Sequence, residues 1–412
     1  MKIVCVGGGP AGLYLGILMK RADPNNHVVV YERKPRGRLD GWGVGFWDDL
    51  LTDLHNTDPE TAQRVRQSAI GWQGQRIALD GEGAVYEGSG YGIARSRLLT
   101  ILTERALEVG VEIHFEHAVT TADEVADADV VVASDGVNST IRGKDNARFG
   151  SNIVVGRNKY AWLATDKHLD KFTFAFARTP AGLIWSHGYA FGDGMSTCII
   201  ETTPETWQGL GLDTLSGPDS LSLLENAFGE QLGGGRLFGL GDHSAPLQWL
   251  NYRTLTNERW SEGNTVLVGD AAHTTHFSIG SGTRLALQDA IGLADALQHA
   301  GSPQSAFAVY EKRRRATILT DQSNARHSRL WFEHIERYGD LPMPVFFGLL
   351  RARRDPLLPH VPPALYYRFY ATAERIPALR TAKRRVGPAA RKLYSKLARP
   401  PHRQIDQVGS SR

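Results

Sequence analysis

The chain opens on Lys2-Ile3-Val4-Cys5-Val6-Gly7-Gly8-Gly9-Pro10-Ala11-Gly12, and this stretch decides the fold. A short run of β-branched residues precedes the glycines, and an apolar, helix-like stretch follows them from Leu13 to Met19. The run His27–Tyr31 is typical of a second buried strand and is followed by Glu32. Strand, turn, helix and strand in this order indicate a βαβ unit with parallel strands.

The glycines have the spacing Gly7-x-Gly9-x-x-Gly12, which favours a dinucleotide-binding turn over a glycine turn without a ligand. Gly7 allows a tight turn, Gly9 lets the backbone approach a pyrophosphate, and Gly12 lets helix and strand pack closely. The N–H groups of the following helix attract phosphate, and a carboxylate at Glu32 can accept hydrogen bonds from ribose. The predicted contacts are Gly7, Gly9, Pro10, Ala11, Gly12 and Glu32.

The pattern changes to period two between residues 160 and 201, where Phe172, Phe174 and Phe176 alternate, and this predicts antiparallel strands. A buried strand returns at 265–268, and a helix is expected from about Thr283 to His299. The sequence therefore predicts an α/β fold with a Rossmann-like nucleotide domain. Its parts are 1–155 and 262–330 for that domain, 156–261 for an inserted antiparallel or mixed β-sheet substrate domain, and 331–412 for a helical, basic C-terminal region.

Composition narrows the class of protein. Mean hydropathy is −0.29 and no run of about 18 apolar residues occurs, so we expect no membrane span. Cys5 and Cys198 are the only cysteines and have no metal-site spacing, so neither a metal site nor a disulfide framework is predicted. The N-terminus lacks the pattern of a signal peptide, which predicts a cytoplasmic protein.

Charge is distributed unevenly along the chain. Residues 351–412 hold 15 Lys and Arg against 3 Asp and Glu, whereas the whole chain has a net charge of only +3. Such a basic tail can bind nucleic acid, an anionic membrane surface or a phosphate-bearing small molecule, or it can be a solvated helical surface. The interleaved aromatic and basic residues of a nucleic-acid module are absent, so we expect no nucleic-acid partner.

Two later segments complete a family pattern. Ser134-Asp135-Gly136 and Gly269-Asp270-Ala271-Ala272-His273 each follow a buried strand. With the first motif they resemble the three fingerprints of the FAD-dependent aromatic hydroxylases, the single-component flavoprotein monooxygenases. The resemblance implies FAD as the cofactor, with Asp270 on a ribityl hydroxyl, although a turn cap would use the same residue. It further assigns cofactor contacts to Arg33, Arg97, Asp135, Gly280 and Gly282.

The resemblance also implies the reaction. NADH or NADPH reduces FAD, O2 adds to form a flavin C4a-hydroperoxide, and one oxygen reaches an electron-rich aromatic ring. A base for the substrate proton is expected at His276, next to the flavin-facing loop, or at His187 on the inserted sheet; both could instead be structural histidines. Phe277, Trp185 and Tyr189 are expected to wall an aromatic pocket, or to belong to the core.

A narrower resemblance concerns the substrate. Residues 274–283, Thr-Thr-His-Phe-Ser-Ile-Gly-Ser-Gly-Thr, are similar to the hydroxylases of salicylyl-CoA and anthraniloyl-CoA. Phosphate contacts would then come from Arg284 and the basic tail. Indole hydroxylases of violacein-type pathways share the His-Phe-Ser-Ile-Gly element and are the alternative. A flavin halogenase would need a Trp-x-Trp-x-Ile motif, which is absent. The sequence makes no prediction of the oligomeric state.

Overall fold

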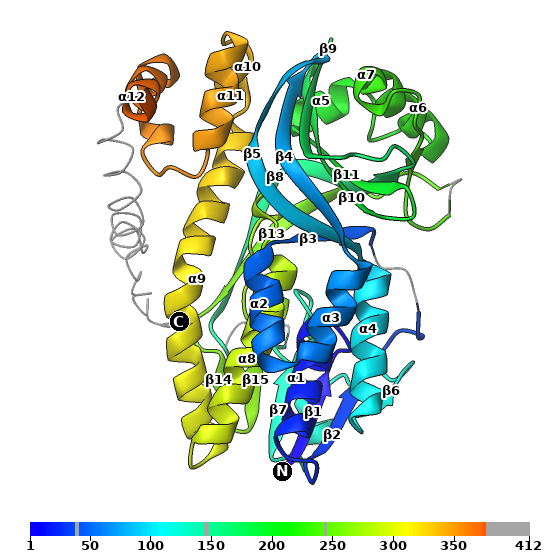
Figure 1. Cartoon of the computed structure of the whole chain (residues 1–412), viewed down its shortest axis with the longest axis vertical. Coiled ribbons are helices and arrows are strands. Elements are labelled where there is room, and N and C mark those ends of the chain that lie inside the picture. The colour runs from blue at the N-terminus through cyan, green and yellow to red at the C-terminus, as the bar shows by residue number, and fades with distance from the viewer. Residues whose placement is uncertain (38–40, 144–147, 243–244, 376–412) are drawn as a thin grey trace, which may run out of the picture.

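Two β-sheets and a long helix that runs past both organise the computed structural model of the chain (Figure 1). The structure describes residues 1–37, 41–143, 148–242 and 245–375. The first sheet consists of β1 (Lys2–Val6), β2 (His27–Tyr31), β6 (Glu112–His114), β7 (Val130–Ala133), β14 (Ser261–Glu262) and β15 (Thr265–Leu267). Its order is β14-β15-β7-β1-β2-β6, and all neighbours are parallel except β14 and β15. This sheet confirms the predicted α/β fold with a Rossmann-like part.

The second sheet is mixed. Its strands are β3 (Gly43–Phe46), β4 (Ile70–Leu79), β5 (Glu82–Ala94), β8 (Ser151–Thr165), β9 (Phe172–Thr179), β10 (Gly182–Gly192), β11 (Met195–Thr202), β12 (Leu237–Phe238) and β13 (Leu250–Asn257). The order is β12-β8-β11-β10-β9-β4-β5-β3, with β13 also paired to β8. Strands β4 and β9 are parallel, and the other pairs are antiparallel.

The composition of this sheet corrects one expectation. The second sheet was expected from residues 156–261, but β3, β4 and β5 come from the first 155 residues and β8 begins at Ser151. Glycines such as Gly74 in β4 and Gly88 in β5 interrupt the alternation of these strands, so the sequence carries no clear period-two pattern there. Sheet pairing is a long-range property, so the segments that the sequence analysis separated at residue 156 interleave in space.

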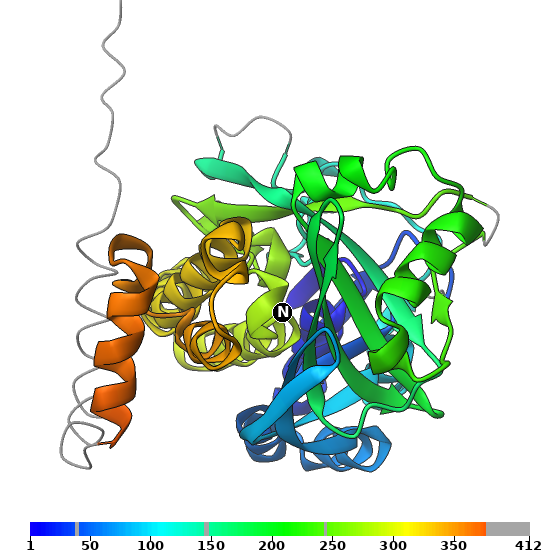
Figure 2. The same cartoon turned by 90° about the horizontal axis from the view of Figure 1, so that it is seen from above.

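Helices cover both sheets. They are α1 (Pro10–Ala22), α2 (Asp48–Thr57), α3 (Pro59–Ser68), α4 (Arg95–Glu108), α5 (Pro204–Gly209), α6 (Gly217–Ala227), α7 (Gly229–Leu232), α8 (Gly282–His299), α9 (Pro303–Glu333), α10 (Glu336–Gly339), α11 (Met343–Ala352) and α12 (Pro363–Arg375), with short 3-10 turns η1 (Ala122–Val125), η2 (Gly269–Ala271), η3 (Phe277–Ile279) and η4 (Leu358–His360). Figure 2 shows α5 to α7 on one side of the second sheet and α9 to α11 on the other. The predicted helix near 283–299 is confirmed as α8.

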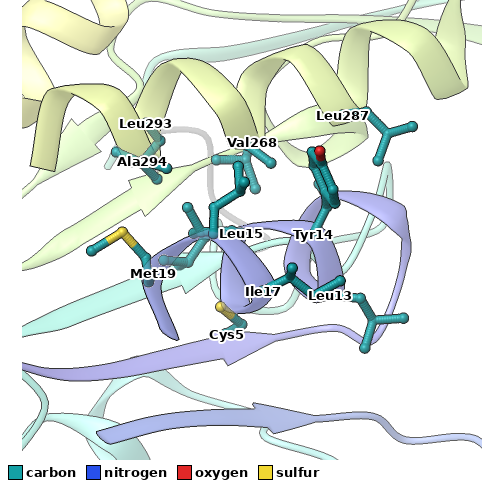
Figure 3. Packing of buried hydrophobic residues seen from close by; sticks show 14 of the residues in the cluster. Cys5, Leu13, Tyr14, Leu15, Ile17, Met19, Val268, Leu287, Leu293 and Ala294 are labelled. Carbon is teal, nitrogen blue, oxygen red and sulfur yellow. The ribbon is translucent and has the colours of Figure 1, made fainter. Parts of the chain in front are cut away.

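Helix α1 is buried from its start to Met19 because it packs between the parallel sheet and α8. Every residue from Pro10 to Met19 is buried, which explains why this helix has no polar face. In Figure 3, Leu293 and Ala294 of α8 lie over Leu15 of α1, with Val268 beside them. This packing joins the N-terminal βαβ unit to the chain that returns after residue 261.

The end of the chain is described only in part. The C-terminal region, predicted to be helical, contains the end of α9 and α10 to α12. Residues 376–412, which carry most of the Lys and Arg of that region, lie outside the described residues. Within the described ranges, no helix has the length and apolar character needed to cross a membrane.

Candidate functional site

A cleft of about 500 Å³ opens where the strands of the parallel sheet end. Its walls come from the turn after β1, the end of β2, the start of α4, the turn after β7, and the turn after β15 with the start of α8. Ligands of open parallel sheets bind at the carboxyl ends of the strands. Many of the predicted cofactor contacts line this cleft. They are Gly7, Gly9, Pro10, Ala11, Glu32, Arg33, Asp135, Asp270 and Gly282.

The glycine turn has the geometry that its spacing predicts. Gly7 has φ +109°, and a Cβ there would lie 2.5 Å from the backbone oxygen of Ser134. A Cβ on Gly12 would lie 2.3 Å from the backbone oxygen of Gly7, so α1 could not approach the turn with any other residue. Gly12 therefore stands behind the cleft and does not line it, in keeping with the packing role predicted for the third glycine.

Glu32 connects the end of β2 to the glycine turn. One carboxylate oxygen accepts a hydrogen bond from the Gly8 backbone nitrogen at 2.8 Å, and the other accepts from the Lys34 nitrogen at 2.9 Å. A carboxylate has further lone pairs, and Glu32 lines the cleft. It can therefore hold the turn and still accept from a ligand hydroxyl. Arg33 is exposed at the rim.

The second and third motifs are linked by a buried arginine. Arg142 Nη1 donates to the backbone oxygen of Ala271 at 3.0 Å, and Asp135 Oδ2 accepts from the Thr140 nitrogen at 2.6 Å. The other oxygen of Asp135, Oδ1, is buried and has no partner among the described residues. A buried acceptor without a partner is costly unless a ligand satisfies it.

Asp270 faces the open space of the cleft and makes no hydrogen bond within the described residues. Asp270 is exposed to the cleft, and desolvation by the neighbouring protein raises its pKa, with His273 and Arg95 acting in the opposite direction. A turn cap would accept a hydrogen bond from the backbone, and the Asp270 carboxylate accepts none within the described residues. It is therefore better suited to accept a hydrogen bond from a ligand hydroxyl.

Arg95, which the sequence analysis did not single out, lines the cleft where Arg97 was expected. Arg95 is the first residue of α4, and its Nε is buried without a partner among the described residues. Arg97 is exposed, lies outside the cleft and donates to Ser68 Oγ at 3.2 Å. Side chains two positions apart in an α-helix differ in direction by about 200° around the helix axis, so only one of the two arginines can face the cleft.

The segment from Asp270 to Gly282 joins the cleft to the second sheet. Both of its ends line the cleft, and its middle carries His276 and Phe277 against the second sheet. The Phe277 ring centroid lies 4.3 Å from that of His276, 5.3 Å from His187 and 4.9 Å from Tyr160. The structure thus brings together the two histidines and one of the three aromatic residues predicted for the substrate pocket. Gly280 does not line the cleft; a Cβ there would lie 2.6 Å from the Trp47 ring.

His187 is buried and its Nε2 lies 3.2 Å from Glu201 Oε2. Glu201 also accepts from Trp185 Nε1 at 3.0 Å and Asn158 Nδ2 at 2.8 Å. Burial lowers the pKa of His187, although its bond to Glu201 acts in the opposite direction. Burial alone would raise the pKa of Glu201, but its hydrogen bonds and its attraction to the His276 and His187 imidazoles hold this pKa below the usual value, so we assign an ionised carboxylate beside a neutral imidazole.

His276 is buried at the start of η3. Burial lowers its pKa to about 4, and the charges of Arg329 and Arg353 act in the same direction. Its Nδ1 lies 2.8 Å from Ser278 Oγ and accepts from the Ser278 nitrogen at 3.3 Å. At neutral pH this imidazole is uncharged.

Three predicted substrate contacts have other roles in the structure. Trp185 is fully buried, donates to Glu201 and stacks on Phe332 at 5.6 Å, so it belongs to the core. The hydroxyl of Tyr189 donates to the Gly43 backbone oxygen at 3.0 Å and thereby holds β3. Arg284 lies 2.9 Å from Asp321 and 3.3 Å from Asp49. Because these carboxylates already balance its charge, Arg284 is poorly suited to bind a substrate phosphate.

Glu201 is the main site residue that the sequence analysis missed. It stands inside the buried strand β11, whose neighbouring residues are apolar or small. A charged residue in such a strand is rare unless it is paired, and this signal could have found it. Its partner could not be read from spacing, because Glu201 lies opposite Trp185 across β10 and β11, and His187 stands two residues further on the same face.

Comparisons with known proteins agree with this site. A family model described as "FAD binding domain" matches residues 240–321. A 3-hydroxy-4-methyl-anthranilyl-[aryl-carrier protein] 5-monooxygenase from Streptosporangium sibiricum is 34% identical over 345 residues, which are 83% of this chain and 91% of that protein. The chain belongs to the FAD-dependent aromatic monooxygenases. A salicyloyl-CoA 5-hydroxylase from a Streptomyces species is 36% identical over 82% of this chain, which spans only 66% of that protein.

Two further similar proteins extend the comparison. A protodeoxyviolaceinate monooxygenase from Chromobacterium violaceum is 30% identical over 89% of this chain and 97% of its own. The solved structure of 2-methyl-3-hydroxypyridine-5-carboxylic acid oxygenase has a TM-score of 0.63 at 20% identity, over 81% of this chain and 92% of that one. At this identity the solved structure supports the fold alone.

The residues of the cleft fit FAD, the cofactor of this monooxygenase. The glycine turn at the start of α1 suits a pyrophosphate. Asp135 and Arg95, whose Oδ1 and Nε are buried without partners among the described residues, line the same cleft as Asp270. FAD offers both hydroxyl donors and phosphate acceptors, so it can satisfy these groups.

Proposed function

We propose that this monooxygenase hydroxylates an aromatic ring that is carried as an acyl thioester, such as salicylyl-CoA or anthraniloyl-CoA. The observation that carries the proposal is the segment from Asp270 to Gly282, because its ends line the FAD cleft while its middle carries His276 and Phe277 against His187. An aromatic ring beside Phe277 would lie next to the cofactor. The names of two relatives, which refer to a CoA ester and an aryl-carrier protein, support the thioester.

The overall reaction is a two-electron oxidation of the ring. An aryl C–H, O2, NADH or NADPH and one proton give an aryl C–OH, the oxidised nicotinamide and water. Bound FAD supplies the redox chemistry that takes electrons from the nicotinamide and activates O2. The chain's own residues have other tasks. Asp270, Arg95 and Asp135 hold the cofactor, Phe277 and Tyr160 flank the ring, and the buried surroundings of His187 exclude water.

Binding of the CoA phosphates is proposed for the basic C-terminal region rather than for Arg284, whose charge is balanced by Asp49 and Asp321. Residues 351–412 carry 15 of the 47 basic residues of the chain. Removal of residues 376–412 should then raise the KM for an aryl-CoA and leave the KM for NAD(P)H unchanged. An unchanged KM for the aryl-CoA would contradict this assignment.

The test is NAD(P)H oxidation by the FAD-loaded enzyme with product analysis. The panel contains salicylyl-CoA, anthraniloyl-CoA, both free acids, indole and a tryptophan derivative. We expect only the thioesters to stimulate oxidation and to gain one oxygen atom. Hydroxylation of the free acids at the same kcat/KM would reject the thioester requirement. Hydroxylation of the indoles alone would favour a second candidate, an indole-derived substrate, which the 30% identity to protodeoxyviolaceinate monooxygenase supports.

A further inference from the structure

The two histidines beside Phe277 are held by opposite ring nitrogens. His187 is bonded through Nε2, to Glu201, and His276 is bonded through Nδ1, to Ser278. A neutral imidazole has one N–H donor and one acceptor nitrogen, and the bond made by one nitrogen decides the character of the other. The fold therefore determines what each histidine presents to a substrate.

At His187 the bonded nitrogen must be the donor. Glu201 is an ionised carboxylate that can only accept, and it already receives hydrogen bonds from Trp185 and Asn158. Nε2 of His187 thus carries the proton. Its Nδ1 is unprotonated and can accept a hydrogen bond, and this atom is buried without a partner among the described residues. His187 presents an acceptor.

At His276 the bonded nitrogen must be the acceptor. The backbone N–H of Ser278 lies 3.3 Å from Nδ1, and a backbone amide can only donate. Nδ1 is therefore unprotonated, and the proton of this neutral ring lies on Nε2, which makes no hydrogen bond in the described part of the chain. His276 presents a donor.

A chain of hydroxyl groups supports the same assignment. Arg353 Nε donates to Ser328 Oγ at 3.1 Å, Ser328 Oγ lies 2.7 Å from Ser278 Oγ, and Ser278 Oγ lies 2.8 Å from His276 Nδ1. Arg353 has no proton acceptor to offer, so the hydroxyl protons can point in sequence toward Nδ1. Arg353 is buried, is 4.9 Å from the Phe174 ring, and belongs to none of the ion pairs of the described residues.

We propose that His187 Nδ1 and His276 Nε2 form an acceptor–donor pair that recognises an aromatic ring bearing a hydroxyl or amino group next to a carbonyl. Glu201 and Arg353, the latter through Ser328 and Ser278, are the positioning residues. Both imidazoles contact Phe277, and the proposal places the aromatic acyl group beside that ring. The inference rests on the proposed function for the identity of the ring substituents.

The two histidines have different roles in the reaction. His187 takes the O–H or N–H proton of the substituent as the new C–O bond forms, which raises the electron density of the ring. The ring carbon then loses its hydrogen as a proton to solvent, and His187 returns its proton to the substituent. His276 donates to the carbonyl oxygen throughout and exchanges no proton.

The decisive experiment reads the two tautomers directly in the substrate-free holoenzyme. Two-bond ¹H–¹⁵N correlation spectra of enzyme labelled with ¹⁵N-histidine separate protonated from bare ring nitrogens. The signals are assigned with His187→Gln and His276→Gln. We expect both rings to be neutral with the proton on Nε2. A proton on Nδ1 of either ring would overturn the proposal.

Glu201→Gln tests the positioning role. The amide oxygen of this variant can still accept from Trp185 Nε1 and His187 Nε2, which share Glu201 Oε2, but the negative charge that stabilises a protonated His187 is lost, so we expect an unchanged tautomer and a hydroxylation rate lower by about 100-fold. Glu205→Gln is the matched control, because Glu205 is exposed and pairs with Arg157 outside the site. FAD content and thermal stability must match the control. A folded Glu201→Gln enzyme with full coupling of NAD(P)H oxidation to product would reject the role of Glu201.

Ser328→Ala tests the hydrogen-bond chain that runs from Arg353 through Ser328 and Ser278 to His276. We expect a higher KM for the carbonyl-bearing substrate with a smaller change in kcat, because His276 binds the substrate and moves no proton. A loss confined to kcat would contradict this division of work. If the tautomers agree with the proposal but no thioester in the panel is hydroxylated, the acceptor–donor pair stands and the proposed function fails, so the two failures are distinguishable.

Discussion

Asp289 of α8 accepts a hydrogen bond from the backbone nitrogen of Gly269 at 2.9 Å. The same carboxylate oxygen lies 2.8 Å from His273 Nε2, and the other oxygen accepts from Arg314 Nε at 2.8 Å. All of these groups are buried. Gly269 immediately precedes Asp270, so the buried carboxylate determines how the third motif presents Asp270 to the FAD cleft.

We expect Asp289→Asn to lower the free energy of unfolding by about 3–5 kcal/mol, because it leaves the buried Arg314 without its counter-charge. Chemical denaturation of the apoprotein measures this loss. Asp295→Asn is the matched control on the same helix, since Asp295 is exposed and pairs with Arg313; its effect should stay within about 1 kcal/mol. Equal effects of the two substitutions would show that the buried network does not stabilise the fold.

Asp270→Ala should weaken FAD binding without destabilising the apoprotein. The carboxylate makes no hydrogen bond within the described residues, so its removal costs only the bond to the cofactor. A hydrogen bond to a charged group contributes about 1.5–3 kcal/mol, which is roughly 10-fold to 100-fold in Kd. Titration of the apoprotein with FAD, followed by fluorescence, gives the Kd. A variant that retains the wild-type Kd contradicts the assignment of Asp270.

Arg95→Ala and Arg97→Ala separate the structure from the sequence-based expectation. Arg95 lines the cleft with an unpartnered buried Nε, whereas Arg97 is exposed and bonded to Ser68. We expect Arg95→Ala to raise the Kd for FAD by at least about 10-fold, and Arg97→Ala to leave it unchanged. The reverse order of the two Kd values would favour the contact that the sequence resemblance implies.

His276 should make stability depend on pH. Burial lowers its pKa from 6.5 to about 4, so below pH 6.5 the unfolded chain binds a proton that the folded chain resists. Stability is then lost as the pH falls from 6.5 toward 4, by about 2 kcal/mol between pH 7 and pH 5. Denaturation curves at both pH values should show a smaller loss in His276→Gln. An equal loss would mean that His276 is not held neutral by the fold.

Much of the cofactor site could be predicted from the sequence because its determinants are local. Gly7 needs a positive φ, Gly12 needs the absence of a Cβ, and Asp270 follows directly on a buried strand. Such requirements are expressed by the residue itself and its neighbours. The same reasoning could not choose between Arg95 and Arg97, because the choice depends on which side of α4 faces the cleft.

The side-chain cluster around Phe277 depends on distant parts of the chain. Glu201 meets His187 because β10 and β11 pair in one particular register, and Arg353, which directly follows α11, reaches Ser278 across 75 residues of sequence. Trp185 and Tyr189 were expected at the substrate, and packing assigned them to the core and to β3. The amino-acid sequence alone was enough to predict the glycine turn, which follows from backbone sterics, and the resemblance of its three motifs to a known family indicated the family and the cofactor. Only the tertiary structure decided which nitrogen of each histidine remains free, since sheet register and helix packing select their hydrogen-bond partners.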